Sequence, residues 1–199
     1  MKIIGLTGSI GMGKSTIAKM LKDLGVPVFD ADHYVHLMLS SGGLLVDKIG
    51  KIFPEAIKTS KNRKYIDRKI LGEIVFKNKE KKNILEKIIH PEVSRQRKKW
   101  KNCFQRENYR AICYDVPLLF ETEGDKACDC IIVVSAPFFI QKRRVLRRKN
   151  MNKIKFFNIL KNQLPDSEKR KRADYIVNTG NGYRHSRDQL KRIVKKILL

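Results

Sequence analysis

The chain has 199 residues, 42% of them hydrophobic, which is enough for one substantial globular domain with its own core. Its 44 Lys and Arg residues outnumber its 20 Asp and Glu residues and give a formal net charge of +24. No apolar run approaches the ~20 residues of a membrane span, and the first residues lack a signal-peptide pattern. We therefore expect a cytoplasmic protein with no membrane segment.

The positive charge favours an anionic partner, either nucleic acid or a small substrate that carries several phosphates. Composition alone does not choose between these two classes. The four cysteines include no CxxC pair and lack the spacing of a zinc site, so we expect reduced thiols.

The first thirty residues predict a strand–helix–strand unit. An apolar run at 2–7 is typical of a buried parallel strand. Apolar residues at helical spacing then follow over 14–24, and Gly25 is placed to end that helix. A second strand is expected at 26–29, so the ligand side of the sheet lies at the carboxyl ends of these strands.

Residues 33 to about 107 show helical patterns and no convincing strand, and we expect Pro91 to interrupt the helical run after His90. A dense basic stretch follows at 141–155. The pattern predicts three further strands and an amphipathic C-terminal helix, at 111–115, 130–135, 175–177 and 190–198. Together these patterns indicate an α/β fold with a helical insertion and a basic mobile segment.

A phosphate-binding loop lies between the first strand and the first helix. Its residues match G-x-x-x-x-G-K-[ST] in full, in the strand–loop–helix context that confirms such a match. The glycines let backbone N–H groups turn toward phosphate oxygens, Lys14 would reach the β- and γ-phosphates, and Ser15 would ligate Mg²⁺. The candidates for binding ATP are Gly8, Gly11, Met12, Gly13, Lys14, Ser15 and Thr16.

Such a loop indicates nucleotide binding but does not identify the phosphate acceptor. The sequence contains no NKxD motif, which weakens a GTPase interpretation, and it is short for a helicase or transporter. A P-loop kinase is therefore favoured.

Two carboxylates, Asp30 and Asp32, follow the second predicted strand. If the chain is still extended there, this spacing points both to one side, and one of them can accept the proton of an attacking hydroxyl. The alternative is that Asp32 caps the helix that follows. The position of the two residues alone favours neither interpretation over the other.

A series of motifs, taken in order, resembles the dephospho-CoA kinase family from about residue 2 to residue 180. They are the phosphate loop, Asp30-Ala31-Asp32, Ile66-Asp67-Arg68, His90-Pro91, Asp115-Val116-Pro117-Leu118-Leu119-Phe120-Glu121, Gln141 with Arg144 and Arg148, and Ala173-Asp174-Tyr175 with Asn178. The resemblance implies a three-layer P-loop NTPase fold that transfers the γ-phosphate of ATP to the ribose 3′-hydroxyl of dephospho-CoA, with Mg²⁺.

The resemblance also implies a division of the single domain over 1–199. The core comprises about 1–32, 108–140 and 170–199, the insertion at about 33–107 binds the acceptor, and the basic stretch at about 141–169 is a lid. The partners it implies are ATP and dephospho-CoA. We expect a monomer or weak homo-oligomer without a specific nucleic-acid partner.

For the acceptor side, the resemblance implies that Asp32 is the catalytic base and that Arg68, His90 and Leu118 contribute to substrate binding. A guanidinium suits bidentate contact with the acceptor's diphosphate, although Arg68 could equally be a solvated helix end. His90 is not expected to be a base. His36 stands where the family commonly has Arg, so it would contact acceptor phosphate weakly unless protonated.

For the ATP side, Arg144 and Arg148 would share one helix face and close over the transferred phosphoryl, whereas Arg143 and Arg147 are expected at the surface. Without the resemblance, the whole basic run would be a solvated face. Asp115 either helps to hold Mg²⁺ or is a buried partner of the phosphate loop. The remaining candidates near the adenine are Asn178 and Gly180.

The sequence leaves two rival functions open. One is a P-loop kinase that acts on another nucleoside, nucleotide or small alcohol. The other is a nucleic-acid-binding protein that uses ATP as a switch, although its aromatic residues are not interleaved with basic ones as a base-stacking surface requires.

Overall fold

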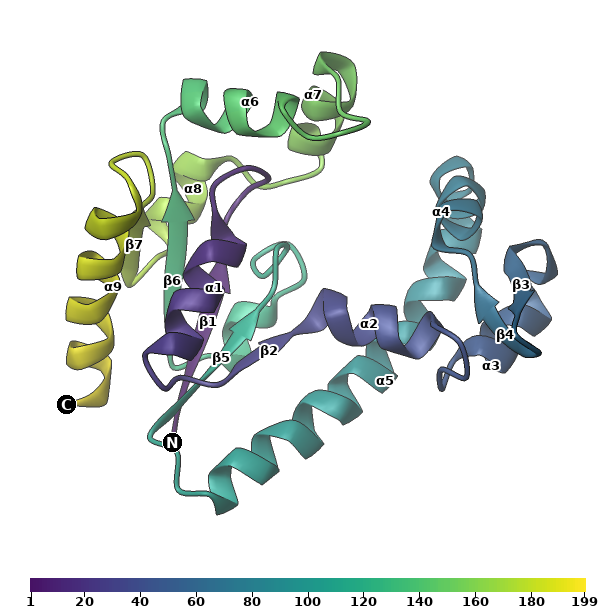
Figure 1. Cartoon of the computed structure of the whole chain (residues 1–199), viewed down its shortest axis with the longest axis horizontal. Helices are drawn as coiled ribbons and strands as arrows, with labels where there is room; N and C mark the ends of the chain where they lie inside the picture. Colours follow the sequence, from purple (N-terminus) through teal and green to yellow (C-terminus); the bar gives the residue numbers. More distant parts are fainter. The chain divides into compact units, whose positions relative to one another are not determined.

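The computed structural model describes residues 1–199, apart from the side chain of Lys77. The chain divides into two compact units. The core unit comprises Met1–Phe29 and Cys103–Leu199, and the inserted unit comprises Asp30–Asn102 (Figure 1). The single-domain division expected from the sequence stays a prediction.

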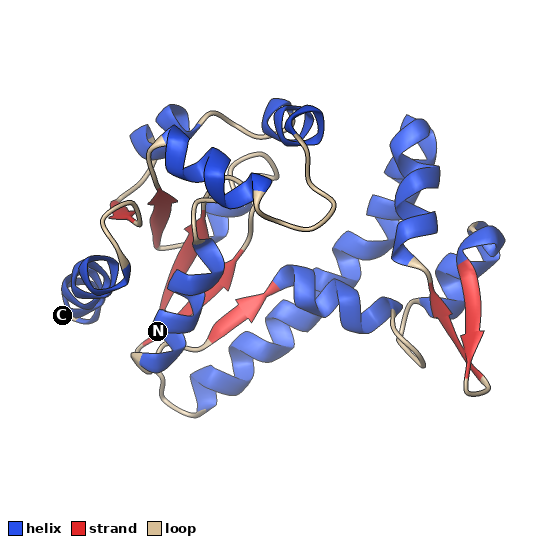
Figure 2. Ribbon diagram, turned by 45° about the horizontal axis from the view of Figure 1, so that its top comes forward, coloured by secondary structure: helices blue, strands red, loops and turns tan.

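A five-stranded sheet forms the centre of the core unit, with strand order β2-β5-β1-β6-β7 (Figure 2). β1 pairs in parallel with both β5 and β6, and β6 pairs in parallel with β7. The strands are β1 (Lys2–Thr7), β2 (Val28–Asp30), β5 (Ala111–Asp115), β6 (Cys130–Ser135) and β7 (Tyr175–Asn178). All five strands expected from the sequence are therefore confirmed. The near-continuous apolar composition of the inner strands β1, β5 and β6 is explained by burial on both faces.

Helices lie on both faces of this sheet and around its carboxyl edge (Figure 1). They are α1 (Lys14–Asp23), η2 (Gly124–Ala127), α6 (Phe138–Leu146), α7 (Lys153–Lys161), α8 (Asp166–Lys171) and α9 (Tyr183–Leu198). Among the residues that the structure describes, no helix is both long enough and apolar enough to cross a membrane.

Alternate residues of β6 pack into two different hydrophobic layers, one on each face of the sheet. Ile132 and Val134 pack with the buried faces of α1 and α9, whereas Ile131 and Val133 pack with Leu119 on the opposite face. Because successive side chains of a strand point to opposite faces, one central strand serves both layers. The expected three-layer α/β fold is confirmed.

The inserted unit has its own core, in which Ile49, Phe53 and Ala56 are almost completely buried. Its elements are α2 (Ala31–Leu39), α3 (Val46–Ile52), η1 (Pro54–Ala56), β3 (Ile57–Ser60), β4 (Arg63–Ile66), α4 (Arg68–Lys77) and α5 (Lys79–Arg106), the last of which continues into the core unit.

The expectation that residues 33–107 contain no strand is wrong. β3 and β4 form an antiparallel hairpin in which Ser60 lies opposite Arg63. The turn residues Lys61 and Asn62 both have positive φ, as in the two-residue turns that match the twist of a hairpin. The strands were missed because they are short and largely exposed, so they lack an alternation of apolar and polar residues.

The expected helix break at Pro91 is also wrong, because α5 continues through Pro91 over 28 residues. Proline removes one backbone hydrogen bond and crowds the preceding turn, at a cost of about 3 kcal/mol. Ile88, before it, is buried in the inserted unit's core, and Val93, after it, packs against the same cluster. Apolar burial on both sides of Pro91 offsets the local cost.

Candidate active site

The phosphate loop connects β1 to α1 at the carboxyl edge of the sheet. Gly11 and Gly13 have φ of 80° and 92°, a region that residues with a Cβ rarely adopt. The Met12 N–H donates to the Ser9 carbonyl and closes a turn inside the loop. No side chain in the described part of the chain caps the start of α1, and the N–H groups of Thr16 and Ile17 donate to the carbonyl of Gly13.

Lys14 forms an ion pair with Asp115 across the junction of β1 and β5. Its Nζ lies 2.5 Å from Asp115 Oδ1, and the two side chains are 18% and 5% exposed. Because β1 and β5 are neighbours in the sheet, the residue that opens α1 meets the carboxylate that ends β5. Of the two interpretations of Asp115, the bond to the phosphate loop is observed, and the metal role stays a prediction.

The groups near the loop fit a magnesium ion that is shared with nucleotide phosphates. In the part of the chain that the structure describes, no cluster of three or more His, Cys, Asp or Glu side chains could hold a metal by itself. Mg²⁺ usually takes one or two protein oxygens and completes its shell with phosphate and water. The hydroxyl of Ser15 and the carboxylate of Asp115 supply oxygen donors of that kind.

A cavity of about 370 Å³ opens beside the phosphate loop in the core unit. It is lined by Gly11, Gly13, Ser15, Thr16, Ile17, Met20, Arg144, Arg148, Thr179, Gly182, Tyr183 and Ser186. Four of the residues proposed for ATP binding and both proposed lid arginines therefore meet at one cavity.

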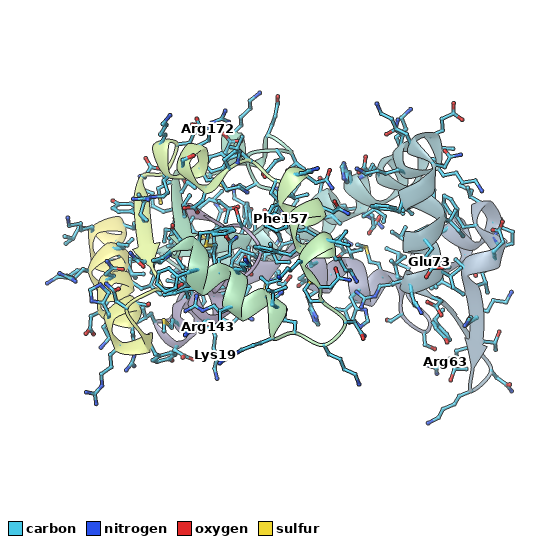
Figure 3. The ribbon with its side chains drawn as sticks, turned by 90° about the horizontal axis from the view of Figure 1, so that it is seen from above. Lys19, Arg63, Glu73, Arg143, Phe157 and Arg172 are labelled. Carbon is cyan, nitrogen blue, oxygen red and sulfur yellow. The ribbon has the colours of Figure 1, made fainter. Side chains whose placement is uncertain are left out.

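The two arginines reach this cavity from different local structures. The helix α6 ends at Leu146, so the expectation that Arg144 and Arg148 share one helix face is wrong. Arg148 lies just beyond the helix end, yet it still lines the cavity. Arg143 and Arg147 are exposed, as predicted, and Arg143 is labelled in Figure 3.

Two glutamines hold the tip of the phosphate loop at the peptide groups of Ile10. Gln141 Nε2 of α6 donates to the Ile10 carbonyl at 2.8 Å. The Ile10 N–H donates to Gln163 Oε1, which lies before α8, at 3.0 Å. A Cβ on Gly11 would lie 2.5 Å from Val145, so α6 also packs directly against the loop. The first helix of the predicted lid is therefore anchored to the phosphate loop.

Sequence reasoning missed the residues that follow β7 at the cavity. Thr179, Tyr183 and Ser186 line it, and none of the motifs points to them. The available signal was their position after the last predicted strand, whose carboxyl end lies at the same edge of the sheet. Among the described residues that line the cavity, Asn178 and Gly180 do not occur. The Gly180 N–H instead donates to Asn178 Oδ1 at 2.8 Å, and their role toward adenine stays a prediction.

A buried lysine ties α8 to the loop that follows β5. Lys169 is fully buried, and its Nζ lies 2.9 Å from Glu121 Oε1 and donates to the Pro117 carbonyl at 3.2 Å. Burial tends to raise the pKa of Glu121, but hydrogen bonds from Lys169 and from the Leu164 N–H outweigh it and lower this pKa below its usual value.

The Glu121 carboxylate is expected to make stability depend on pH. A depressed pKa contributes stability above the unfolded-state pKa of about 4.3, and this contribution is lost as the pH falls through the folded-state pKa. Glu121→Gln should therefore reduce the free energy of unfolding by about 3 kcal/mol at neutral pH, because the buried Lys169 loses its counter-charge. The difference between wild type and Glu121→Gln should shrink below about pH 4. Urea unfolding of both proteins from pH 7 to pH 3 measures it, and a constant difference contradicts this role.

The strand ends within the segment Asp30-Ala31-Asp32, because Asp30 is the last residue of β2 and Ala31 is the first residue of α2. Asp30 is the N-cap of α2, and its Oδ1 accepts a hydrogen bond from the His33 N–H at 3.0 Å. The expected extended pair of carboxylates is therefore wrong, and so is the alternative in which Asp32 is the cap. Asp32 lies in the first turn of α2 with an exposed side chain, and its role as a base stays a prediction.

The other acceptor-side candidates are distributed over several elements. Arg68 begins α4 and is exposed, directly after Asp67, whose carboxylate caps that helix. His90 is exposed within α5, and Leu118 is 38% exposed in the turn that follows β5. His36 lies in the last turn of α2. Their contacts with an acceptor stay predictions.

Comparison with known proteins extends over the whole chain. The profile of the dephospho-CoA kinase family matches residues 2–184. A dephospho-CoA kinase of Bartonella quintana is 42% identical over 198 residues, which cover 100% of this chain and 99% of that protein.

Two solved structures have the same fold. A crystal structure from Thermus thermophilus superposes with a TM-score of 0.84 at 31% identity, covering 100% of this chain and 98% of the other. A dephospho-CoA kinase from Campylobacter jejuni superposes with a TM-score of 0.68 at 30% identity, covering 98% and 97%. The phosphate loop, the arginine-lined cavity and these matches agree, and the chain belongs to the dephospho-CoA kinase family.

Proposed function

We propose that this protein transfers the γ-phosphoryl group of ATP to the ribose 3′-hydroxyl of dephospho-CoA and so produces coenzyme A and ADP. The observation that carries the proposal is the complete phosphate loop beside a cavity lined by Arg144 and Arg148, in a chain whose family match spans residues 2–184. The enzyme class is a phosphotransferase with an alcohol group as acceptor.

The residues of the core unit are proposed to bind and polarise ATP. Backbone N–H groups of the phosphate loop hold the phosphates, and the Lys14 ammonium balances charge on the β- and γ-phosphates. Arg144 and Arg148 contribute further positive groups where charge spreads over the transferred phosphoryl. Mg²⁺, held by Ser15 and by Asp115 directly or through water, would neutralise phosphate charge when bound.

The residues of the inserted unit are proposed to bind the acceptor and remove its proton. Asp32 accepts the proton of the ribose 3′-hydroxyl as that oxygen attacks the γ-phosphorus, and the bond to the β-phosphate oxygen breaks to release ADP. Arg68 binds the acceptor's diphosphate, for which a planar guanidinium is suited. His90 of the inserted unit and Leu118 of the core unit are proposed as further contacts of the acceptor. Asn178 and Gly180 of the core unit are proposed as contacts of the adenine.

The proposal extends to the setting of the reaction. We propose a cytoplasmic enzyme that acts as a monomer or weak homo-oligomer and has no specific nucleic-acid partner. The +24 charge then serves mainly substrates that carry several phosphates.

A coupled assay of ADP release with ATP and Mg²⁺ tests this function. Dephospho-CoA, adenosine, AMP, a nucleic-acid sample and no acceptor are compared at the same ionic strength. We expect turnover with dephospho-CoA at least about a hundredfold above every other condition, because only this acceptor supplies both the diphosphate and the free 3′-hydroxyl.

Turnover with adenosine or AMP instead would retain the kinase chemistry and contradict the acceptor assignment. ADP release that depends on added nucleic acid would contradict the whole proposal and favour an ATP-dependent switch.

A further inference from the structure

Thr179, the first residue after β7, joins the phosphate loop to a cavity arginine. It is 7% exposed, and its N–H donates to the Ser135 carbonyl at 2.9 Å, which continues the pairing of β7 with β6. A Cβ on Gly13 would lie 3.3 Å from Thr179 Oγ1, so the side chain packs against the last glycine of the loop. No motif in the sequence identifies this residue.

The hydroxyl of Thr179 both donates and accepts a hydrogen bond. It donates to the Met12 carbonyl at 2.6 Å, and it accepts a hydrogen bond from Arg144 Nη1 at 2.8 Å. A hydroxyl has a single proton, so its contact with the loop leaves its lone pairs for the guanidinium. Arg144 Nη2 donates in addition to the Thr179 carbonyl at 2.8 Å. Two adjacent donors of one planar guanidinium are therefore held by one residue.

The two arginines of the cavity differ in how firmly hydrogen bonds hold their guanidinium groups. Across the residues that the structure describes, the guanidinium of Arg148 has no hydrogen bond or ion pair, whereas that of Arg144 is fixed at two points. A fixed guanidinium loses less freedom when a ligand binds, and its charge needs no reorganisation during the reaction.

We propose that Thr179 is a positioning residue: it fixes the Arg144 guanidinium relative to the phosphate loop, so that the cavity binds ATP with this arginine already in place. The inference rests on the proposed function, because it takes the cavity to be the site of ATP. Arg148 is then the arginine that adjusts to the nucleotide.

Two substitutions at Thr179 and one at Arg144 test the proposal. Thr179→Val keeps the shape that packs against Gly13 and removes both hydrogen bonds of the hydroxyl. Thr179→Ser keeps the hydroxyl and loses only a methyl group. The first readout is the affinity for a non-hydrolysable ATP analogue, which needs no acceptor, and the second is kcat/KM for ATP in the coupled assay.

Thr179→Val should weaken binding of the analogue and lower kcat/KM for ATP by roughly tenfold, the effect of losing a hydrogen bond to a charged group. Thr179→Ser should stay within about threefold of the wild type. In an Arg144→Ala background, Thr179→Val should change either readout by less than about threefold, because residues that act through one another are not additive.

Normal binding and turnover in Thr179→Val would overturn the inference, as would equal losses in the Val and Ser variants. Losses that multiply independently with Arg144→Ala would assign Thr179 a structural role only. If the wild type binds the analogue but does not phosphorylate dephospho-CoA, the proposed acceptor is wrong, and the binding data still decide the role of Thr179.

Discussion

Asp32→Asn is expected to lower kcat by about a thousandfold, within the range by which general bases accelerate proton transfer. Asparagine has nearly the same shape as aspartate but cannot accept the proton of the ribose 3′-hydroxyl. The side chain lies in the first turn of α2, so the substitution leaves the cap of that helix in place. KM for ATP should stay within about twofold, because this residue is assigned to the acceptor.

Asp30→Asn is the matched control for this prediction. Asp30 caps α2 through the His33 N–H, and asparagine is an equally good N-cap, so both folding and turnover should stay within about twofold of the wild type. Steady-state kinetics of the two variants with dephospho-CoA separate the roles. Equal losses in both, or full activity in Asp32→Asn, would contradict Asp32 as the base.

Lys14→Met is expected to lower kcat/KM for ATP by at least about a thousandfold. Methionine fills much of the same space and removes the ammonium group assigned to the β- and γ-phosphates. The loss should appear chiefly in kcat, since charge increases on the phosphates as the transition state forms.

The same substitution should also lower the stability of the protein. A second variant is therefore needed to separate the loss of stability from the loss of activity. Asp115 lies 2.5 Å from Lys14 and is almost completely buried, so loss of the ammonium group should cost about 3 kcal/mol of unfolding free energy. Adding Asp115→Asn removes the buried negative charge and should recover most of that stability without recovering activity. Urea unfolding and kinetics of the single and double variants measure both effects. Turnover that recovers together with stability would assign Lys14 a structural role only.

Much of the core unit could be predicted because its signals are local. Each signal lies within one short stretch of the chain. Examples are the apolar runs of β1 and β6, the glycines of the phosphate loop and the apolar face of α9. The hairpin β3–β4 gave no such signal because its strands are short and exposed. The continuation of α5 through Pro91 depends on packing in the inserted unit, which a local rule for proline does not contain.

In the candidate site, too, contacts between residues that are distant in sequence could not be predicted from local patterns. Lys14 and Asp115 are 101 residues apart in sequence and meet only because β5 is the neighbour of β1 in the sheet. Motifs identified both residues, and a bond of Asp115 to the phosphate loop was one of two open interpretations, but the sequence did not name Lys14 as its partner. Thr179 and Gln163 carry no motif at all, and their importance lies in contacts with Met12 and Ile10 of the loop.

The position of the transferred phosphate tests the central claim most directly. The wild type is incubated with dephospho-CoA and ATP, and the product is purified and examined by mass spectrometry and phosphorus–proton NMR. We expect a gain of one phosphoryl group whose phosphorus couples to the ribose 3′ proton, with one ADP formed per product. Phosphate released to water, or attached at any other hydroxyl, would contradict it.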